Sequence, residues 1–436
     1  MSRDVNNQYI IIPGCCDLNR GDQALGWETA RIAKDAGFVG DYSILAEQNE
    51  PIQQSIDEGY EILRPVLEHP SRKFQDRDNI SYGVRLKLLW GAVALKDLLV
   101  SLIMLSPFLR TVFLHESSSH VQTIRRFAES KAVFMKGGGL IQSHGGLVST
   151  YATYYRLYHI FLAHSFKKPV YILPNSFGPF EGPLVKWMVK RAFKYCRLIT
   201  AREDKSKEAV KDELGLNINV FPDLAFYLQN GTVSKDELFS KLRISPHQKV
   251  VAITMRPYRF PDSENPEAAY KQFQIEMRQF IRELNKRKFV PLIIEHTFAT
   301  TSHESDGDCI KAVLSEMDPK EYRLLSDRSM NCRDLKAVYG MCDYIVGTRF
   351  HSLIFSLSNK IPGIAISYDG YKSVGIMADM GLEDFVIDIG KVSSKRLLKM
   401  FDMMLEHESD SLEKIDKYIS MANKERLRLI QSIQEA

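Results

Sequence analysis

A repeated alternation of short apolar runs with longer segments of helical periodicity constrains this chain more than any other feature. The runs at 9–12, 132–135 and 170–173 are too short for helices, and a proline or a Lys-Gly pair follows each one. Helical spacing of apolar residues follows over segments such as 22–36. Short strands separated by helices are typical of a parallel sheet with helices on both faces.

The alternation occurs twice, and the polar stretch 229–249 separates the two series. We therefore predict an α/β protein with two Rossmann-like domains, residues 1–228 and 245–390, whose parallel sheets face a cleft. Residues 49–131 form a helical insertion in the first domain, and residues 391–436 form a C-terminal helical segment. Further strands are expected at 198–201, 218–221, 250–255, 290–294, 344–346 and 363–367, and further helices at 183–195, 266–286, 306–316, 331–340 and 352–358.

Composition excludes several classes of protein. The 436 residues are 44% apolar and 26% charged, which is typical of a soluble globular protein. A net charge of only +4 gives no electrostatic reason to expect nucleic acid as a partner. The six cysteines include no C-x-x-C pair, so neither a disulfide framework nor a structural zinc site is predicted. The start of the chain is polar, so we expect no secretory signal and a cytoplasmic location.

The stretch 88–109 is almost as apolar as a membrane span. Only Lys96 and Asp97 interrupt it, and Arg85, Lys87 and Arg110 flank it. One interpretation is a pair of helices buried in the first domain; the other is a helix that lies on a membrane surface. We favour the buried helices, and peripheral membrane contact remains the alternative.

Two of the candidate ligand-binding segments follow strands of the first domain, where open α/β sheets bind their ligands. In the segment 14–22, glycines permit tight turns and a helix start offers N–H groups to an anion, while Asp22 either caps that helix or lines the cleft. In the segment 136–146, three consecutive glycines form either a tight turn or a place of close approach to a ligand, and His144 follows them.

Two further segments carry cationic side chains. Arg202 stands between a predicted strand and a helix, as an anion ligand or as a surface arginine paired with a neighbouring carboxylate. Arg349 and His351 leave an extended backbone on the same side, just before an apolar helix. They would surround an anion with a fixed cation, a titratable imidazole and free N–H groups; the alternative is an interfacial histidine beside an ion-paired arginine.

These motifs, in this order, resemble the polysaccharide pyruvyl transferase family. The resemblance covers residues 9–389, and no motif of the family matches within 49–131. It rests on Gly21-Asp22, Gly137–Gly139, Gly178-Pro179, Arg202–Ser206, Pro222-Asp223, Arg349-Phe-His351, and Tyr368 with Lys372.

The resemblance implies a fold like that of the B-type glycosyltransferases and transfer of a pyruvyl group from phosphoenolpyruvate to two hydroxyls of a sugar, leaving a cyclic ketal. The acceptor would be a glycan or a lipid-linked sugar, and the enzyme would work at the inner face of the cytoplasmic membrane. Neither a metal nor a cofactor beyond the co-substrate is expected. Arg349 and His351 are the expected catalytic residues; the donor site would use these two with Arg202 and Lys372, and the acceptor side Asn19, Gly21, Asp22, Gly137, Gly138, Gly139, His144 and Tyr368.

Two other functions stay open. One is a nucleotide-sugar glycosyltransferase of the same fold, although no two glutamates between Glu264 and Glu383 stand eight positions apart, as they often do in retaining enzymes. The other is a non-catalytic sugar- or anion-binding relative, which the presence of Arg202, Arg349 and His351 disfavours.

Overall fold

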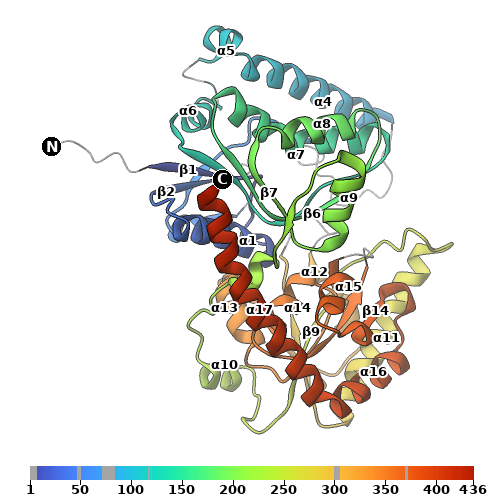
Figure 1. The fold of residues 1–436 in the computed structure, drawn as a ribbon. Helices are drawn as coiled ribbons and strands as arrows, with labels where there is room; N and C mark the ends of the chain where they lie inside the picture. The colour runs from blue at the N-terminus through green and yellow to red at the C-terminus, as the bar shows by residue number, and fades with distance from the viewer. Residues whose placement is uncertain are drawn as a thin grey trace. The chain divides into compact units, whose positions relative to one another are not determined.

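The computed structural model divides the chain into two compact units (Figure 1). It describes residues 7–46, 51–70, 84–115, 118, 120–298, 305–368 and 372–436. The first unit contains Leu25–Leu224 together with the segment up to Asp17 and the segment from Glu425 onward. The second contains Leu18–Ala24 and Ala225–Lys424.

A parallel sheet forms the centre of the first unit, with strand order β3-β2-β1-β4-β6-β7-β8 and with β5 paired to β6. Its strands are β1 (Gln8–Ile12), β2 (Asp41–Leu45), β3 (Glu61–Leu63), β4 (Ala132–Met135), β5 (Gly138–His144), β6 (Val170–Glu181), β7 (Cys196–Ala201) and β8 (Asn219–Val220). The helices are α1 (Arg20–Asp35), α2 (Gln53–Asp57), α4 (Val84–Leu105), α5 (Pro107–Phe113), α6 (Val121–Glu129), α7 (Gly146–Ser165), α8 (Val185–Phe193) and α9 (Asp204–Leu214).

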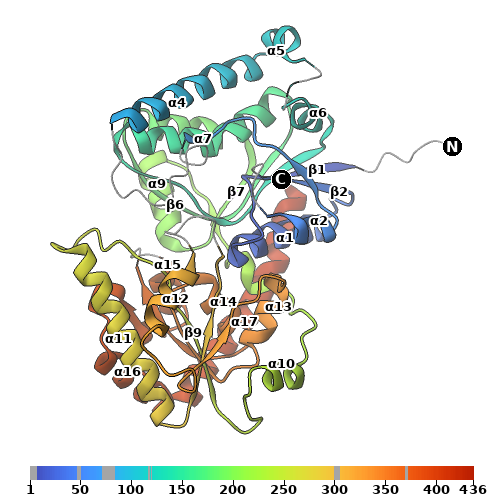
Figure 2. The same cartoon turned by 180° about the vertical axis from the view of Figure 1, so that it is seen from behind.

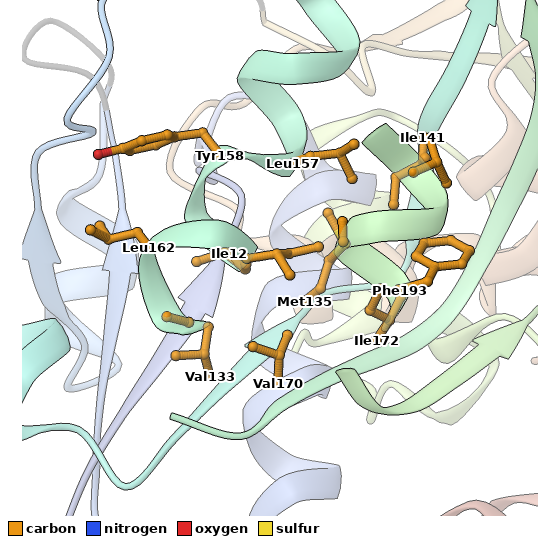
Figure 3. Packing of buried hydrophobic residues seen from close by; sticks show 14 of the residues in the cluster. Ile12, Val133, Met135, Ile141, Leu157, Tyr158, Leu162, Val170, Ile172 and Phe193 are labelled. Carbon is orange, nitrogen blue, oxygen red and sulfur yellow. The ribbon is translucent and has the colours of Figure 1, made fainter. Parts of the chain in front are cut away.

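The core of the first unit lies between this sheet and the helices that cover it. Met135 of β4 is aligned with Ile12 of β1 and with Ile172 of β6, and all three side chains are buried. Leu157 of α7 and Phe193 of α8 belong to the same cluster (Figure 3). Apolar residues occupy nearly every position of β1, β4 and the first half of β6, because both faces of a parallel sheet are buried.

The second unit is built on a six-stranded parallel sheet of order β11-β10-β9-β12-β13-β14. Its strands are β9 (Val250–Thr254), β10 (Val290–Ile294), β11 (Arg323–Leu325), β12 (Tyr344–Gly347), β13 (Gly363–Ser367) and β14 (Val386–Asp388). Its helices are α10 (Lys235–Lys241), α11 (Pro266–Lys286), α12 (Asp306–Leu314), α13 (Cys332–Tyr339), α14 (Phe350–Leu357), α15 (Lys372–Asp379), α16 (Ser394–Glu406) and α17 (Glu408–Glu435), whose end belongs to the first unit; 3₁₀ turns lie at Leu224–Tyr227, Glu383–Phe385 and Ile389–Lys391.

The prediction of two parallel α/β sheets with a helical C-terminal segment is confirmed, and several local predictions differ from the structure. The expected strand 170–173 continues through Pro174 to Glu181. The polar stretch 229–249 contains a short helix, α10. Of the three glycines after β4, Gly138 and Gly139 begin the strand β5, and Gly138 has a φ of +144° that only glycine adopts readily.

The short segment Leu18–Ala24 groups with the second unit, whereas we predicted it in the first domain. Its backbone explains the difference. The N–H of Phe298 donates to the carbonyl of Leu18 at 2.8 Å, and Asn19 forms an antiparallel bridge with Thr297. The Asn19–Asp22 motif therefore lies beside the carboxyl end of β10.

The prediction that the stretch 88–109 is buried core is wrong for most of its leucines. The window Leu88–Leu105 has a mean hydropathy of 2.0 and is long and apolar enough to cross a membrane, yet only 22% of it is buried. Both views show α4 on the outer side of α7 (Figures 1 and 2). Arg110, predicted as a basic flank, is instead buried, with its guanidinium 3.6 Å from the centre of the Phe166 ring.

Candidate functional site

The best-defined polar cluster of the second unit is a buried ion pair at the carboxyl edge of its sheet. Nε and Nη2 of Arg349 each lie 2.7 Å from Oδ1 of Asp306, which is completely buried. The other carboxylate oxygen accepts the backbone N–H groups of His296 at 3.1 Å and Thr297 at 3.0 Å. Burial raises the pKa of the Asp306 carboxyl, and the charge and hydrogen bonds of Arg349 oppose that rise. The two contacts with Asp306 hold the Arg349 guanidinium in one orientation.

Close backbone packing brings Arg349 to this position. Arg349 precedes α14 directly after the end of β12, and its carbonyl accepts a 2.6 Å hydrogen bond from Ser352 Oγ. A Cβ atom at Gly347 would lie 2.9 Å from Ser352 Oγ and 3.0 Å from Thr254 Oγ1. A glycine is therefore needed where the chain leaves β12 and turns into α14.

His351 packs against Gly21, which is 330 residues earlier in the sequence (351 − 21). A Cβ atom at Gly21 would lie 2.1 Å from His351 Nδ1 and 2.8 Å from His351 Cβ, so no larger residue fits without moving the imidazole. Gly21 is in the first turn of α1, and His351 is in the first turn of α14. The two predicted motifs, Asn19–Asp22 and Arg349–His351, thus meet in the second unit.

The predicted cap of α1 is at a different residue. The Oδ1 atom of Asn19, not Asp22, accepts the backbone N–H of Asp22 at 3.3 Å, and the carbonyl of Asn19 accepts from Gln23 at 2.9 Å. The side chain of Gln23 in turn accepts the N–H of Cys332 at 2.8 Å. Asp22 is half-buried in the first turn of α1, where a carboxylate interacts favourably with the helix dipole.

His296 is a buried histidine of the same cluster. Burial lowers the pKa of His296 well below its usual value, and the charges of His351, Arg349 and Arg20 lower it further. His296 is therefore neutral at pH 7, and its Nδ1 lies 3.1 Å from the hydroxyl of Tyr339. Its buried Nε2 has no hydrogen-bond partner among the residues that the structure describes.

A pocket of about 600 Å³ lies at the carboxyl edge of the same sheet, where the chain leaves β9 and β13. Tyr258, Phe260 and Tyr368 line it together with Asp262 and Asp388. The Tyr258 hydroxyl donates to the carbonyl of Tyr368 at 2.9 Å, which holds the two loops together. Rings beside carboxylates are suited to a molecule with both apolar faces and hydroxyl groups.

Arg256 and Lys372 are two further cationic residues of the second unit. The guanidinium of Arg256 stacks on the Tyr368 ring, 4.1 Å from its centre. Lys372, predicted to bind the donor, begins α15, and its side chain lies outside the described residues.

In the first unit, Arg202 is not a surface arginine. Its side chain is 2% exposed, and its Nη1 lies 2.7 Å from Asp223 Oδ2. Its Nε donates to Ser176 Oγ at 2.7 Å and lies 3.3 Å from a carboxylate oxygen of Glu203. Arg202 thus joins β6, the start of α9 and the segment after β8 in a buried network.

The remaining predicted residues of the first unit follow the central strands. Gly137 is buried, and a Cβ there would lie 2.9 Å from the carbonyl oxygen of Pro174, so the close approach is between two backbones. Gly138 and Gly139 begin β5, and His144, at its far end, is exposed. Lys136, which sequence reasoning did not select as a ligand, is buried and donates to the carbonyl of Gly14 at 2.7 Å.

Sequence reasoning missed Asp306 and His296. His296 stands two residues past β10, so the strand-end rule that selected Arg349 could have found it. Asp306 had no such signal, because it lies in a polar region at the start of a predicted helix. Within the described ranges, no group of three or more His, Cys, Asp or Glu side chains could hold a metal ion.

Comparisons with known proteins agree with the predicted resemblance. The sequence model "Polysaccharide pyruvyl transferase" matches residues 19–370. The amylovoran biosynthesis protein AmsJ of Erwinia amylovora is 24% identical over 262 residues, which are 59% of this chain and 61% of AmsJ. The match thus spans about three fifths of that relative's length.

Solved structures share the fold at low sequence identity. The UDP-GlcNAc 2-epimerase of Neisseria meningitidis bound to UDP-GlcNAc has a TM-score of 0.58 at 12% identity, with 98% of this chain and 100% of that chain covered. HepE of Anabaena, in complex with UDP and glucose, has a TM-score of 0.54 at 11% identity, with 99% and 98% covered. These likenesses support the B-type glycosyltransferase fold of two Rossmann-like domains.

The family match covers most of the chain and includes Asn19–Asp22 and Arg349–His351. With the order of the motifs and the fold, it shows that this chain belongs to the polysaccharide pyruvyl transferase family, whose members are transferases of polysaccharide biosynthesis.

Proposed function

We propose that this protein transfers the pyruvyl group of phosphoenolpyruvate to two hydroxyl groups of a glycan or lipid-linked sugar. The product is a cyclic ketal, and the released group is inorganic phosphate. The observation that carries the proposal is the fixed arrangement of Arg349 and His351 beside the first turns of α1 and α14.

This arrangement is suited to an anion. Arg349 is positioned by Asp306, and a planar guanidinium binds phosphate or carboxylate with two parallel hydrogen bonds. The N-terminal turns of α1 and α14 add N–H groups and the positive ends of two helix dipoles. Burial is the main cause of the lowered pKa of His296, and the charges of His351, Arg349 and Arg20 add to it. Phosphoenolpyruvate carries both a phosphate and a carboxylate, so its charge complements the cluster.

The reaction proposed for this site exchanges the phosphate of phosphoenolpyruvate for two sugar oxygens. The methylene carbon of phosphoenolpyruvate gains a proton, and a sugar hydroxyl adds to the adjacent carbon and loses its own proton. The bond from that carbon to the phosphate oxygen then breaks, and the second hydroxyl adds and gives up its proton to the departing phosphate. His351 acts as the acid, either at the methylene carbon or at the phosphate, and Arg349 stabilises the negative charge of the donor.

The aromatic pocket of the second unit is our candidate for the sugar. A pyranose presents apolar C–H faces to rings such as Tyr368 and hydroxyls to carboxylates such as Asp262 and Asp388. The other residues predicted for the acceptor side include Gly21, which accommodates His351, and Gly137, which packs against the carbonyl of Pro174. Tyr368 is therefore the predicted acceptor residue whose surroundings fit a sugar best.

The reaction itself is tested by incubating the protein with phosphoenolpyruvate and a panel of glycans. We expect release of inorganic phosphate and a glycan mass increased by one ketal-linked pyruvyl group. Replacing Arg349 with alanine should weaken phosphoenolpyruvate binding by about 2–5 kcal/mol, because the variant loses the oriented cation. Calorimetry checks this, with the exposed Arg396→Ala as the matched control.

Two results would contradict this assignment. One is wild-type protein that binds UDP but not phosphoenolpyruvate, which would favour the nucleotide-sugar glycosyltransferase. The other is unchanged donor affinity in an Arg349→Ala variant that melts like the wild type. Binding of phosphoenolpyruvate without any turnover would favour the non-catalytic relative.

We predict that His351 acts in the chemical step. His351→Gln should lower kcat by about 10²–10⁴-fold with a smaller effect on phosphoenolpyruvate affinity, because glutamine cannot transfer the proton. Gly21→Ala should lower kcat in the same direction, since its methyl group occupies the space of the imidazole. Gly91→Ala, a glycine of α4 with no atom near its added methyl group, is the control and should keep full activity. Normal kcat in both site variants would assign His351 a structural role.

Arg202 is expected to affect stability more than catalysis. Its removal leaves the carboxylate of Asp223 buried without its ion-pair partner, so Arg202→Ala should lower the free energy of unfolding by about 3–5 kcal/mol. Arg197→Ala, at an exposed arginine of β7, the strand that precedes Arg202, should change it by less than about 0.5 kcal/mol. Urea titration measures both. An Arg202→Ala variant of normal stability that no longer binds phosphoenolpyruvate would instead support the predicted donor role.

The pocket makes a separate prediction about the acceptor. Tyr368→Ala should raise KM for the glycan about tenfold with little change in phosphoenolpyruvate affinity, because it removes a ring that the sugar stacks on. Tyr368→Phe keeps the ring and should retain near-normal KM. Steady-state kinetics with varied glycan checks both variants, and equal effects of the two substitutions would show that stacking is not the contribution of Tyr368.

A further inference from the structure

Helix α4 has its polar residues inside and its leucines outside. The inner face packs on α7 and carries Asp97 and Ser101, both buried. The Asp97 carboxylate accepts the hydroxyl of Tyr151 and, at 3.0 Å, the backbone N–H of Glu68. Ser101 Oγ accepts the Tyr154 hydroxyl at 2.6 Å. These hydrogen bonds fix the rotation of the helix, so the exposure of its other face follows from them.

The outer face is a continuous row of leucines. Leu88, Leu95, Leu99 and Leu102 are 70%, 59%, 55% and 54% exposed, and their spacing places them on the side of α4 opposite Asp97. Exposed residues of α5 continue the apolar surface: Phe108, Val112 and Phe113. We call the exposed apolar residues of α4 and α5 the leucine face. At 1.5 Å per residue the 22 residues of α4 alone extend over about 33 Å.

The charged side chains that α4 and α5 expose are basic. Asp97 is the sole acidic residue in the sequence from 84 to 113, and it is buried on the opposite side of α4. Arg85 is exposed in the first turn of α4, and Lys87 follows it in the sequence. Lys96, at the edge of the face, is half exposed and lies 3.1 Å from a carboxylate oxygen of Glu68. An exposed apolar surface whose own two helices expose basic and no acidic side chains complements an anionic lipid surface.

We propose that the leucine face binds a lipid bilayer containing anionic headgroups, with α4 lying in the plane of the interface. Leucines directed outward and hydrogen-bonded polar groups directed inward are the arrangement of a helix whose outer neighbour is hydrocarbon. A spanning orientation would separate Asp97 and Ser101 from α7.

Lipid binding by this face is independent of the pyruvyl-transfer chemistry, which involves residues of the second unit. If both hold, the enzyme acts at a membrane surface, where lipid-linked sugars are found. The inner face of a cytoplasmic membrane, with its anionic lipids, is the location that this proposal implies.

The test is flotation of the full-length protein with vesicles of phosphatidylcholine, with and without phosphatidylglycerol. We expect the wild type to float, and to float more with phosphatidylglycerol. The triple variant Leu95→Gln, Leu99→Gln, Leu102→Gln should lower vesicle binding by at least about tenfold, because each leucine loses favourable contact with hydrocarbon. The control replaces two exposed residues of α17, Met421→Gln and Leu427→Gln, and should float like the wild type. Arg85→Glu with Lys87→Glu should reduce binding to the anionic vesicles, by about fivefold for each basic residue lost.

Two measurements on the triple variant make the outcome decisive. Its melting temperature and its phosphoenolpyruvate affinity in solution should equal those of the wild type, because its three leucines are exposed and belong to the first unit, whereas the chemistry involves residues of the second. Wild-type protein that stays at the bottom with both vesicles would overturn the proposal. A triple variant that melts much earlier would overturn the outward orientation of the leucines. A wild-type dimer that becomes monomeric in the triple variant, without flotation, would assign the face to a second copy of this chain.

Discussion

The buried pair of Asp306 and Arg349 organises the site of the second unit. A carboxylate that is completely buried is costly unless it is paired and hydrogen-bonded, and Asp306 satisfies that need with Arg349 and two backbone N–H groups. The same contacts fix the backbone after β10, the start of α12 and the residue before α14. The geometry of the site therefore follows from the contacts that neutralise the buried carboxylate of Asp306.

The contact between Gly21 and His351 shows why a motif needs a partner far away in sequence. Gly21 is not in a backbone conformation that demands glycine; it is a glycine because the imidazole of His351 occupies the space of a side chain. Two contacts hold the first turn of α1 against His351. One is the bridge between Asn19 and Thr297, and the other is the hydrogen bond between Gln23 and Cys332. The Gly-Asp motif therefore acts through packing as much as through its own polar groups.

In the first unit, two buried cations are held by neighbouring polar groups. Arg202 is held by Asp223, Ser176 and Glu203, and Lys136 by the carbonyl of Gly14, so each charge has a partner within the unit. The hydrogen bonds of Asp97 and Ser101 orient α4 in a comparable way. Where polar groups are buried, they decide which side of an element remains exposed.

The sequence by itself determined the two parallel sheets, the strand ends that carry Arg349 and His351, and membership of the family. Those features depend on local periodicity and on short motifs, which are readable without tertiary contacts. It did not determine that the β5 glycines form a strand, that Arg202 is held by Asp223, or that Asp306 fixes Arg349, because each depends on residues brought together from distant positions. The orientation of α4 is the clearest case. Its composition is compatible with a buried helix and with a surface helix, and only the hydrogen bonds of Asp97 and Ser101 to α7 decide that its leucines face outward.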